Sequence, residues 1–473
     1  MPVGAWSWLA DLRARFGGGG GGVRADAGLG ILAFEAAAAM SRLVSLHRSL
    51  SDVEVRRLRA DALRAEGVAR ITSTDQSFLL RLACGELVAD LDRAAGTAAR
   101  LGARCCTGAP FLHDFDSVYA EAKRGNVLAR LDTTVGFSKG AAKRFRKMER
   151  HVAATAKLYA EMDALSELEA SERRMEQWKR HSGPIPAQPA PTAKRQAAEP
   201  GEKLIRELNS QRQKVRRLME GSLWSVAAHK VSKLMAKSVL AVLARISIAF
   251  GAYVPGLPLL TPIRGWAFRR TSGPLQAAAS TAAVVRHSAP IFRQNQKDAA
   301  FSASGSIKPP ANTVGGSGME RRYANVIVSA ETLLMARKPA IHSEEVDVGV
   351  NLSKRDELYK MLPMTIRAAV KAKLRENWRG QPMDEAAAVA SMDAVDRMLR
   401  WLGPMAHDTV RWHDERSMER AQRFSMRPRA LMVQTLHFAD RQKAEDAIVE
   451  VLVGLSCVCW YDDVRRRPAD WDD

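Results

Sequence analysis

Apolar residues recur every three or four positions through most of this chain, and strand-like alternation is almost absent. Because that spacing places apolar side chains on one face of a helix, it predicts an all-α fold. The clearest case runs from Lys143 to His181, where Met148, Val152 and Tyr159 belong to a regular apolar series. We predict multi-helix, bundle-like domains with long amphipathic helices and disordered linkers.

The starts and interruptions of helices also leave signals in the sequence. A serine followed three residues later by glutamate or glutamine caps a helix N-terminus, and this pattern occurs at Ser51, Ser73 and Ser317. The terminal segment Ala444–Trp460 is apolar on nearly every side, as in a buried core helix. Helical spacing also begins at Arg355, Asp384, Thr409 and Arg441, with Pro363, Pro404 and Pro428 punctuating these segments.

Composition shifts divide the chain into segments. Gly17–Gly22 form an uninterrupted glycine run, and five prolines break the helical pattern near residue 190. We predict a flexible N-terminal segment (1–28), an N-terminal helical domain (29–104), a helical extension with the long amphipathic helix (105–181), a proline-rich linker (182–201), a helical region (202–267), an irregular linker (268–317), a second helical domain (318–404) and a C-terminal helical region (405–473).

The charge balance of the chain is strongly basic. Lys and Arg (72) outnumber Asp and Glu (52), which gives a formal net charge of +20. Such a charge attracts phosphate-rich surfaces, although nucleic acid as a partner has no support beyond this net charge. The five cysteines are odd in number and lie mostly in apolar stretches, which favours a reducing compartment. We find no secretory signal, and the longest apolar stretch, Ile246–Leu260, contains prolines and is too short to cross a bilayer.

A search for reactive groups finds no catalytic, cofactor-binding or metal-binding residues that we would assign. Thr313–Gly318 is a glycine-rich run before a helix, but it lacks the Gly-Lys-Ser/Thr ending of a phosphate loop. The cluster from His407 to Glu415 contains two histidines and three acids, but its two histidines are six residues apart, so they point about 120° away from each other on a helix. Cys457 and Cys459 have the wrong spacing for structural zinc and are interpreted as core sulfur, with reversible lipidation as an alternative.

Two features favour binding. One is a basic cluster at the start of the long helix, interpreted as a nuclear import signal or an anionic-surface patch: Lys143, Arg144, Arg146, Lys147 and Arg150. Solvated basic residues at a helix start are the simpler alternative. The other is an N-terminal docking face of Trp8, Leu12 and Phe16, which share one side of a helix beside basic residues and suit a membrane interface or a partner protein. A disordered terminus is the alternative there.

Several uncommon runs carry a resemblance to a known family. In the first half they are Met40–Asp52, Phe78–Cys84, Val135–Lys139, Lys147–Arg150 and Leu165–Met175. In the second half they are Thr313–Ser317, Tyr323–Ile327, Arg355–Tyr359, Met361–Pro363, Ala406–Trp412, Gln434–His437 and Leu455–Trp460. With these runs, which span nearly the whole chain, the sequence resembles the plant PSK-simulator family, whose members contain plant domains of unknown function 3475 and 668.

The resemblance implies a non-enzymatic role in promoting plant growth, linked to signalling by the peptide hormone phytosulfokine, with some members in the nucleus. It brings no catalytic residue. Longer members resemble N-myristoylated proteins, whereas Pro2 stands here where the acceptor glycine would be required, so we expect no N-myristoylation. Glu320-Arg321-Arg322 also interrupt a stretch that is usually apolar in the family.

We therefore expect a regulatory or scaffold protein that binds other proteins in the nucleus or the cytoplasm. The alternative is a peripheral membrane adaptor at the plasma membrane that binds anionic lipid through the N-terminal segment and basic patches.

Overall fold

The computed structural model describes residues 28–105, 110–125, 127–181, 200–254, 257–258, 308–337, 357–377, 384–416 and 423–465. The predicted all-α fold is confirmed: the regular elements in these ranges are helices, and the β-bridges Gly28–Ala227 and Thr313–Asp440 are isolated pairs. None of these helices combines the length and apolar character needed to cross a membrane. The glycine run and most of both predicted linkers lie outside the described residues.

The chain forms two compact units, and each is assembled from separate stretches of sequence. Unit 1 contains residues 1–47, 91–243 and 423–426, and unit 2 contains residues 48–90, 244–422 and 427–473. Sequence neighbours therefore often belong to different units, and residues hundreds of positions apart share one core.

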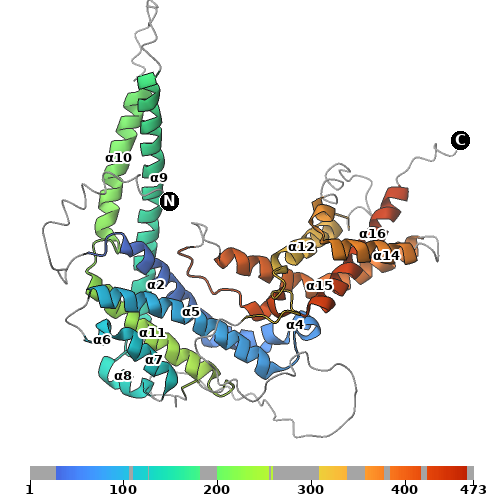
Figure 1. The fold of residues 1–473 in the computed structure, drawn as a ribbon, viewed down its shortest axis with the longest axis horizontal. Helices are drawn as coiled ribbons and strands as arrows, with labels where there is room; N and C mark the ends of the chain where they lie inside the picture. Colours follow the sequence, from blue (N-terminus) through green and yellow to red (C-terminus); the bar gives the residue numbers. More distant parts are fainter. Residues whose placement is uncertain are drawn as a thin grey trace, which may run out of the picture. The chain divides into compact units, whose positions relative to one another are not determined.

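Unit 1 is built around a long helical hairpin. The predicted amphipathic helix is confirmed as α9 (Ala141–His181), and α10 (Pro200–Gly221) packs along it (Figure 1). The other helices of this unit are α2 (Leu32–Ser49), the part of α5 (Gln76–Cys105) from Leu91 onward, α6 (Pro110–His113), α7 (Phe115–Arg124), α8 (Leu128–Val135) and α11 (Ala228–Phe250) as far as Leu243.

Apolar packing and ion pairs hold this hairpin together. Leu158, Met162 and Leu165 of α9 form a buried cluster with Leu208 and Val215 of α10. Beside the cluster, Lys214 lies 2.8 Å from Glu161 and Arg212 lies 3.4 Å from Glu169. The series of apolar residues identified in the sequence is therefore the packing face of α9 rather than a free seam.

Unit 2 is a bundle in which α12 (Glu320–Arg337) and α16 (Arg441–Arg465) pack against α15 (Glu385–Arg416). The series Tyr323, Ile327, Ala330 and Leu334 on α12 is buried, as its spacing predicts. The remaining elements are α3 (Asp52–Ala60), η1 (Ala62–Arg64), α4 (Glu66–Ile71), the part of α5 up to Asp90, α14 (Met364–Asn377), η3 (Met432–Gln434) and η4 (Leu436–Phe438).

Of the three predicted helix caps, one is confirmed. The Ser51 hydroxyl accepts a hydrogen bond from the Glu54 amide at 3.3 Å. The cap at Ser73 is wrong, because the carboxylate of Asp75 accepts from the amides of Ser77 and Phe78 instead. The cap at Ser317 is also wrong, since its hydroxyl donates to the carbonyl of Val314 inside the preceding loop.

The helix break predicted at Pro404 does not occur. Helix α15 continues through this residue to Arg416. Proline removes one helix hydrogen bond, but Leu402, Met405 and Ala406 around it are all buried. Packing on both sides of Pro404 therefore outweighs the local preference, and the segment predicted to begin at Thr409 is the end of one long helix.

Candidate functional site

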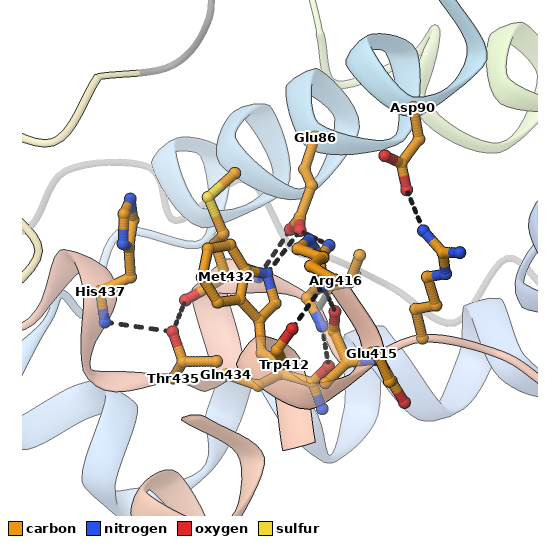
Figure 2. Close-up of polar contacts among 12 residues, drawn as sticks. Glu86, Asp90, Trp412, Glu415, Arg416, Met432, Gln434, Thr435 and His437 are labelled. Atoms are coloured by element: carbon orange, nitrogen blue, oxygen red, sulfur yellow. Dashed lines mark hydrogen bonds and ion pairs between the residues drawn. The ribbon is translucent and has the colours of Figure 1, made fainter. Parts of the chain in front are cut away.

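A buried carboxylate in unit 2 joins three separate parts of the chain. Glu86 of α5 accepts hydrogen bonds from the indole Nε1 of Trp412 at 2.9 Å and from the Met432 amide at 2.6 Å. Its Oε1 atom also pairs with the guanidinium of Arg416. Figure 2 shows these groups converging on Glu86, and we call Glu86, Trp412, Arg416 and Met432 the Glu86 cluster.

Burial dominates the electrostatics of this cluster. Loss of water raises the pKa of Glu86, while Arg416, Trp412 and the Met432 amide oppose that shift. Burial likewise lowers the pKa of Arg416, against the opposing charges of Glu86 and Asp90. The guanidinium also lies 4.4 Å from the centre of the Trp412 ring. Because each oxygen of the carboxylate has partners of its own, the cluster is a satisfied structural junction and not a reactive acid.

The segment after α15 is fixed by further bonds around this junction. The amide of Ala430 donates to Glu415 Oε2 at 2.8 Å, and the amide of Leu436 donates to Thr409 Oγ1 at 2.9 Å. Arg429 lies 4.0 Å from Asp90 on α5. Helix α5, helix α15 and residues 429–437 are therefore held as one polar assembly (Figure 2).

The glycine-rich run at Thr313–Gly318 packs directly against this segment. Val314 donates its amide to Ala439 and Gly315 to His437, while the amides from Gly316 to Met319 find acceptors inside the loop. A phosphate-binding loop needs amides that are free to bind the anion. Since the amides from Thr313 to Met319 are already satisfied, the loop is a packing element, and the phosphate-loop interpretation has no support.

Steric contact explains the glycines of this loop without a ligand. A Cβ atom on Gly315 would lie 2.5 Å from the His437 carbonyl oxygen, and one on Gly316 would lie 2.0 Å from the Pro310 carbonyl oxygen. Gly318 has a φ of 67°, a left-handed conformation that glycine adopts without strain. Each glycine therefore has a structural reason to be there.

A second buried carboxylate follows the loop. Glu320 Oε1 lies 3.6 Å from both His413 Nε2 and His437 Nδ1, and we call these three residues the Glu320 cluster. Those two nitrogens and Glu320 Oε2 are buried without a hydrogen-bond partner. Burial raises the pKa of Glu320, but the nearby His437 and His413 outweigh it and hold that pKa below its usual value.

Acid is expected to destabilise unit 2 through this cluster. Burial lowers the pKa of His413 below 6.5, an effect that Arg321, His437 and Arg416 reinforce and Glu320 opposes. The unfolded chain then binds a proton that the folded chain excludes, so stability falls as pH drops below about 6.5. Glu320 adds a further loss at lower pH, as its carboxylate becomes protonated.

Denaturant unfolding at pH 7.5 and pH 5.5 measures this dependence. The His413→Gln variant should lose less stability between the two pH values than the unsubstituted chain does, whereas His181→Gln, at an exposed histidine, should not differ from it. An unchanged pH dependence in His413→Gln would exclude His413 as the source.

The sequence cluster from His407 to Glu415 disperses in the structure. His407 pairs with Glu331, Asp414 pairs with Arg321, and Glu415 pairs with Arg411. In the ranges that the structure describes, no group of three or more His, Cys, Asp or Glu side chains could hold a metal ion.

Three cysteines are core residues. Cys84, Cys457 and Cys459 are buried and not in disulfides, which agrees with the core-sulfur interpretation. Burial raises the pKa of Cys84 to about 12, so its thiol stays protonated and unreactive at neutral pH. Burial gives the lipidation alternative no support at these positions.

The predicted basic cluster lies in the first turns of α9, and its members differ. Lys143, Arg146, Lys147 and Arg150 are exposed. Arg144 is half-buried and donates to the carbonyls of Lys139, at 2.6 Å, and Phe137. Arg144 therefore fixes the turn before α9, and the other four residues form the accessible surface, which we call the α9 basic cluster. The predicted docking face of Trp8, Leu12 and Phe16 lies outside the described residues.

Comparison with known proteins finds two family profiles that match regions of the chain containing Glu86 and Glu320. The family profile described as Domain of unknown function (DUF3475) matches residues 31–87, and Protein of unknown function (DUF668) matches residues 313–411. Over 90% of its length the chain is 26% identical to Protein PSK SIMULATOR 1 of Arabidopsis thaliana. The chain is thus similar to a PSK SIMULATOR protein and carries both of these domains. Protein PSK SIMULATOR 3 and Protein PSK SIMULATOR 2 of the same plant are 24% and 23% identical over 90% of the chain.

The chain spans 55% to 58% of the length of these PSK SIMULATOR relatives. No solved structure gives a significant match. The two matched domains share one compact unit. Residues 48–87 of the first domain and residues 313–411 of the second all belong to unit 2. The family runs Thr313–Ser317, Ala406–Trp412 and Gln434–His437 meet around the two clusters. Glu86, Glu320 and Arg416 lie outside the runs that carried the resemblance. No sequence signal singled out Glu86 or Arg416, and Glu320 stood out only in the capping pattern at Ser317 and as a charged departure from the family's usual apolar stretch.

Proposed function

We propose that this chain is a non-enzymatic regulatory or scaffold protein that promotes plant growth and acts in phytosulfokine signalling. The observation that carries the proposal is its similarity, over 90% of its length, to proteins named PSK SIMULATOR. The Glu86 cluster supports a non-enzymatic role, since the Glu86 carboxylate is buried and both of its oxygens are used in bonds that join separate parts of the chain.

Genetic complementation tests this role. An Arabidopsis line lacking the three PSK SIMULATOR proteins should recover seedling growth and its response to added phytosulfokine when it expresses this chain. A Glu86→Ala variant, which removes the junction of unit 2, should fail to restore growth. If the unsubstituted chain accumulates in these plants and growth does not recover, the proposed role is wrong.

Nuclear residence is proposed to depend on the α9 basic cluster. Glutamine at Lys143, Arg146, Lys147 and Arg150 should lower the nuclear fraction of a fluorescent fusion several-fold, because import receptors recognise clustered positive charge. Arg144 is left in place since it holds the turn before α9. Fluorescence imaging of plant cells measures the fraction.

A matched control separates import from the loss of positive charge. Glutamine at Lys203, Arg206, Arg216 and Arg217 removes the same charge from exposed positions on α10. This variant should enter the nucleus as the unsubstituted chain does. Equal nuclear fractions in both variants would rule out the α9 basic cluster as the import signal.

A further inference from the structure

A short stretch from the second half of the chain contributes to unit 1. Residues 423–426 belong to unit 1, although the residues on both sides belong to unit 2. The Phe424 ring packs against the edge of the Tyr159 ring with centroids 5.6 Å apart. Tyr159 in turn contacts Phe34 at 5.2 Å, and Phe424 lies against the buried cluster of the α9–α10 hairpin.

The neighbouring arginine adds polar contacts. The Arg423 guanidinium lies 5.5 Å from the centre of the Tyr159 ring and 5.9 Å from that of Phe424. The Ser41 hydroxyl donates to the Ala38 carbonyl at 2.8 Å and shares this proton with the Arg423 backbone carbonyl, which lies 3.3 Å away. Arg423 itself is exposed and Phe424 is half-buried, whereas Ser41 is fully buried. Unit 1 thus supplies a fixed site, and residues 423–426 supply a small occupant.

We infer that Tyr159, Phe34 and Ser41 form a recognition site for a partner peptide in which arginine precedes an aromatic residue, and that Arg423-Phe424 occupies this site in cis. The recognised elements are one aromatic ring, one guanidinium and one backbone carbonyl. Any arginine–aromatic dipeptide can supply all three. Arg423-Phe424 therefore competes in cis with a partner peptide, which must displace it to bind.

Competition from Arg423-Phe424 in cis weakens the binding of a free peptide by a factor that can be calculated. A tethered occupant competes at an effective concentration on the order of 1 mM. If a free peptide of the same sequence binds the empty site with a Kd of about 0.1 mM, occupation in cis lowers its apparent affinity about tenfold. Removing the Phe424 ring from the chain should raise the affinity for the free peptide by the same factor.

Fluorescence anisotropy with a labelled peptide of residues 420–428 tests the inference. The Phe424→Ala chain should bind this peptide about tenfold more tightly than the unsubstituted chain does. A peptide carrying alanine in place of Phe424 has the same charge, and neither chain should bind it. Adding Tyr159→Leu to the Phe424→Ala chain keeps an apolar side chain but removes the ring, so binding should be lost.

Three results would overturn the inference. Equal affinity of both chains for the peptide would show that residues 423–426 do not occupy the site. Equal binding of the peptide without phenylalanine would show that the site does not read the aromatic ring. A concentration-dependent dimer of the unsubstituted chain in sedimentation, lost in Phe424→Ala, would make a second copy the occupant. The assay uses no growth readout, so its result is independent of the proposed growth role.

Discussion

Glu86→Ala is expected to lower the free energy of unfolding by about 3–5 kcal/mol, the range for a buried ion pair that loses one partner. The substitution leaves the Arg416 charge buried beside Trp412 without its carboxylate. It also leaves the indole Nε1 of Trp412 and the Met432 amide without acceptors. Denaturant unfolding followed by tryptophan fluorescence measures the change.

A glutamate in an exposed ion pair provides the control for Glu86→Ala. Glu66 pairs with Arg70 at 2.7 Å, but both side chains are more than half exposed. Exposed pairs contribute about 0–1 kcal/mol, so Glu66→Ala should cost little. If Glu86→Ala costs no more than Glu66→Ala, the Glu86 cluster does not hold unit 2 together.

Replacing both charges shows whether the loss of stability in Glu86→Ala comes from the unpaired charge of Arg416 or from the change at residue 86 itself. A buried ion pair exchanged for apolar residues of similar size is often neutral in stability. Glu86→Leu combined with Arg416→Met should therefore recover part of the loss seen in Glu86→Ala. The Met432 amide still lacks an acceptor in the double variant, so recovery should be incomplete.

The helices could be predicted from the sequence because their signals are local. The apolar series on α9 and α12 reflects packing that repeats with every helical turn, and both faces are buried as expected. The helix break predicted at Pro404 does not occur, since the local effect of proline is opposed by packing of Leu402 and Ala406, which the local pattern does not reveal.

The candidate site could not be predicted because its partners are far apart in the chain. Glu86 is 326 residues from Trp412 and 346 from Met432, so no local spacing connects them. The same holds for Gly315, whose neighbour His437 decides that no side chain fits there. The sequence alone assigns no phosphate or metal site to the glycines and histidines, and it provides no reason for their positions, which long-range packing explains.

A substitution in the glycine-rich run Thr313–Gly318 is expected to have the second large effect on stability. Gly316→Ala is expected to destabilise unit 2 at the upper end of the range of about 1–3 kcal/mol for overpacking, because its Cβ would meet backbone. The obstructing atom is the Pro310 carbonyl oxygen at 2.0 Å, which cannot rotate away as a side chain can. Moving the loop would also weaken the bonds from Val314 to Ala439 and from Gly315 to His437.

Gly318→Ala in the same loop is the matched comparison. A Cβ atom there meets nothing within 4 Å, so its cost comes from the left-handed backbone alone, about 1–2 kcal/mol. Thermal unfolding should therefore show a lower Tm for Gly316→Ala than for Gly318→Ala. Magnesium and ATP should not shift the transition of the unsubstituted chain, because the loop amides already have acceptors. Stabilisation by ATP that Gly316→Ala abolishes would instead establish the loop as a phosphate site and contradict its role as a packing element.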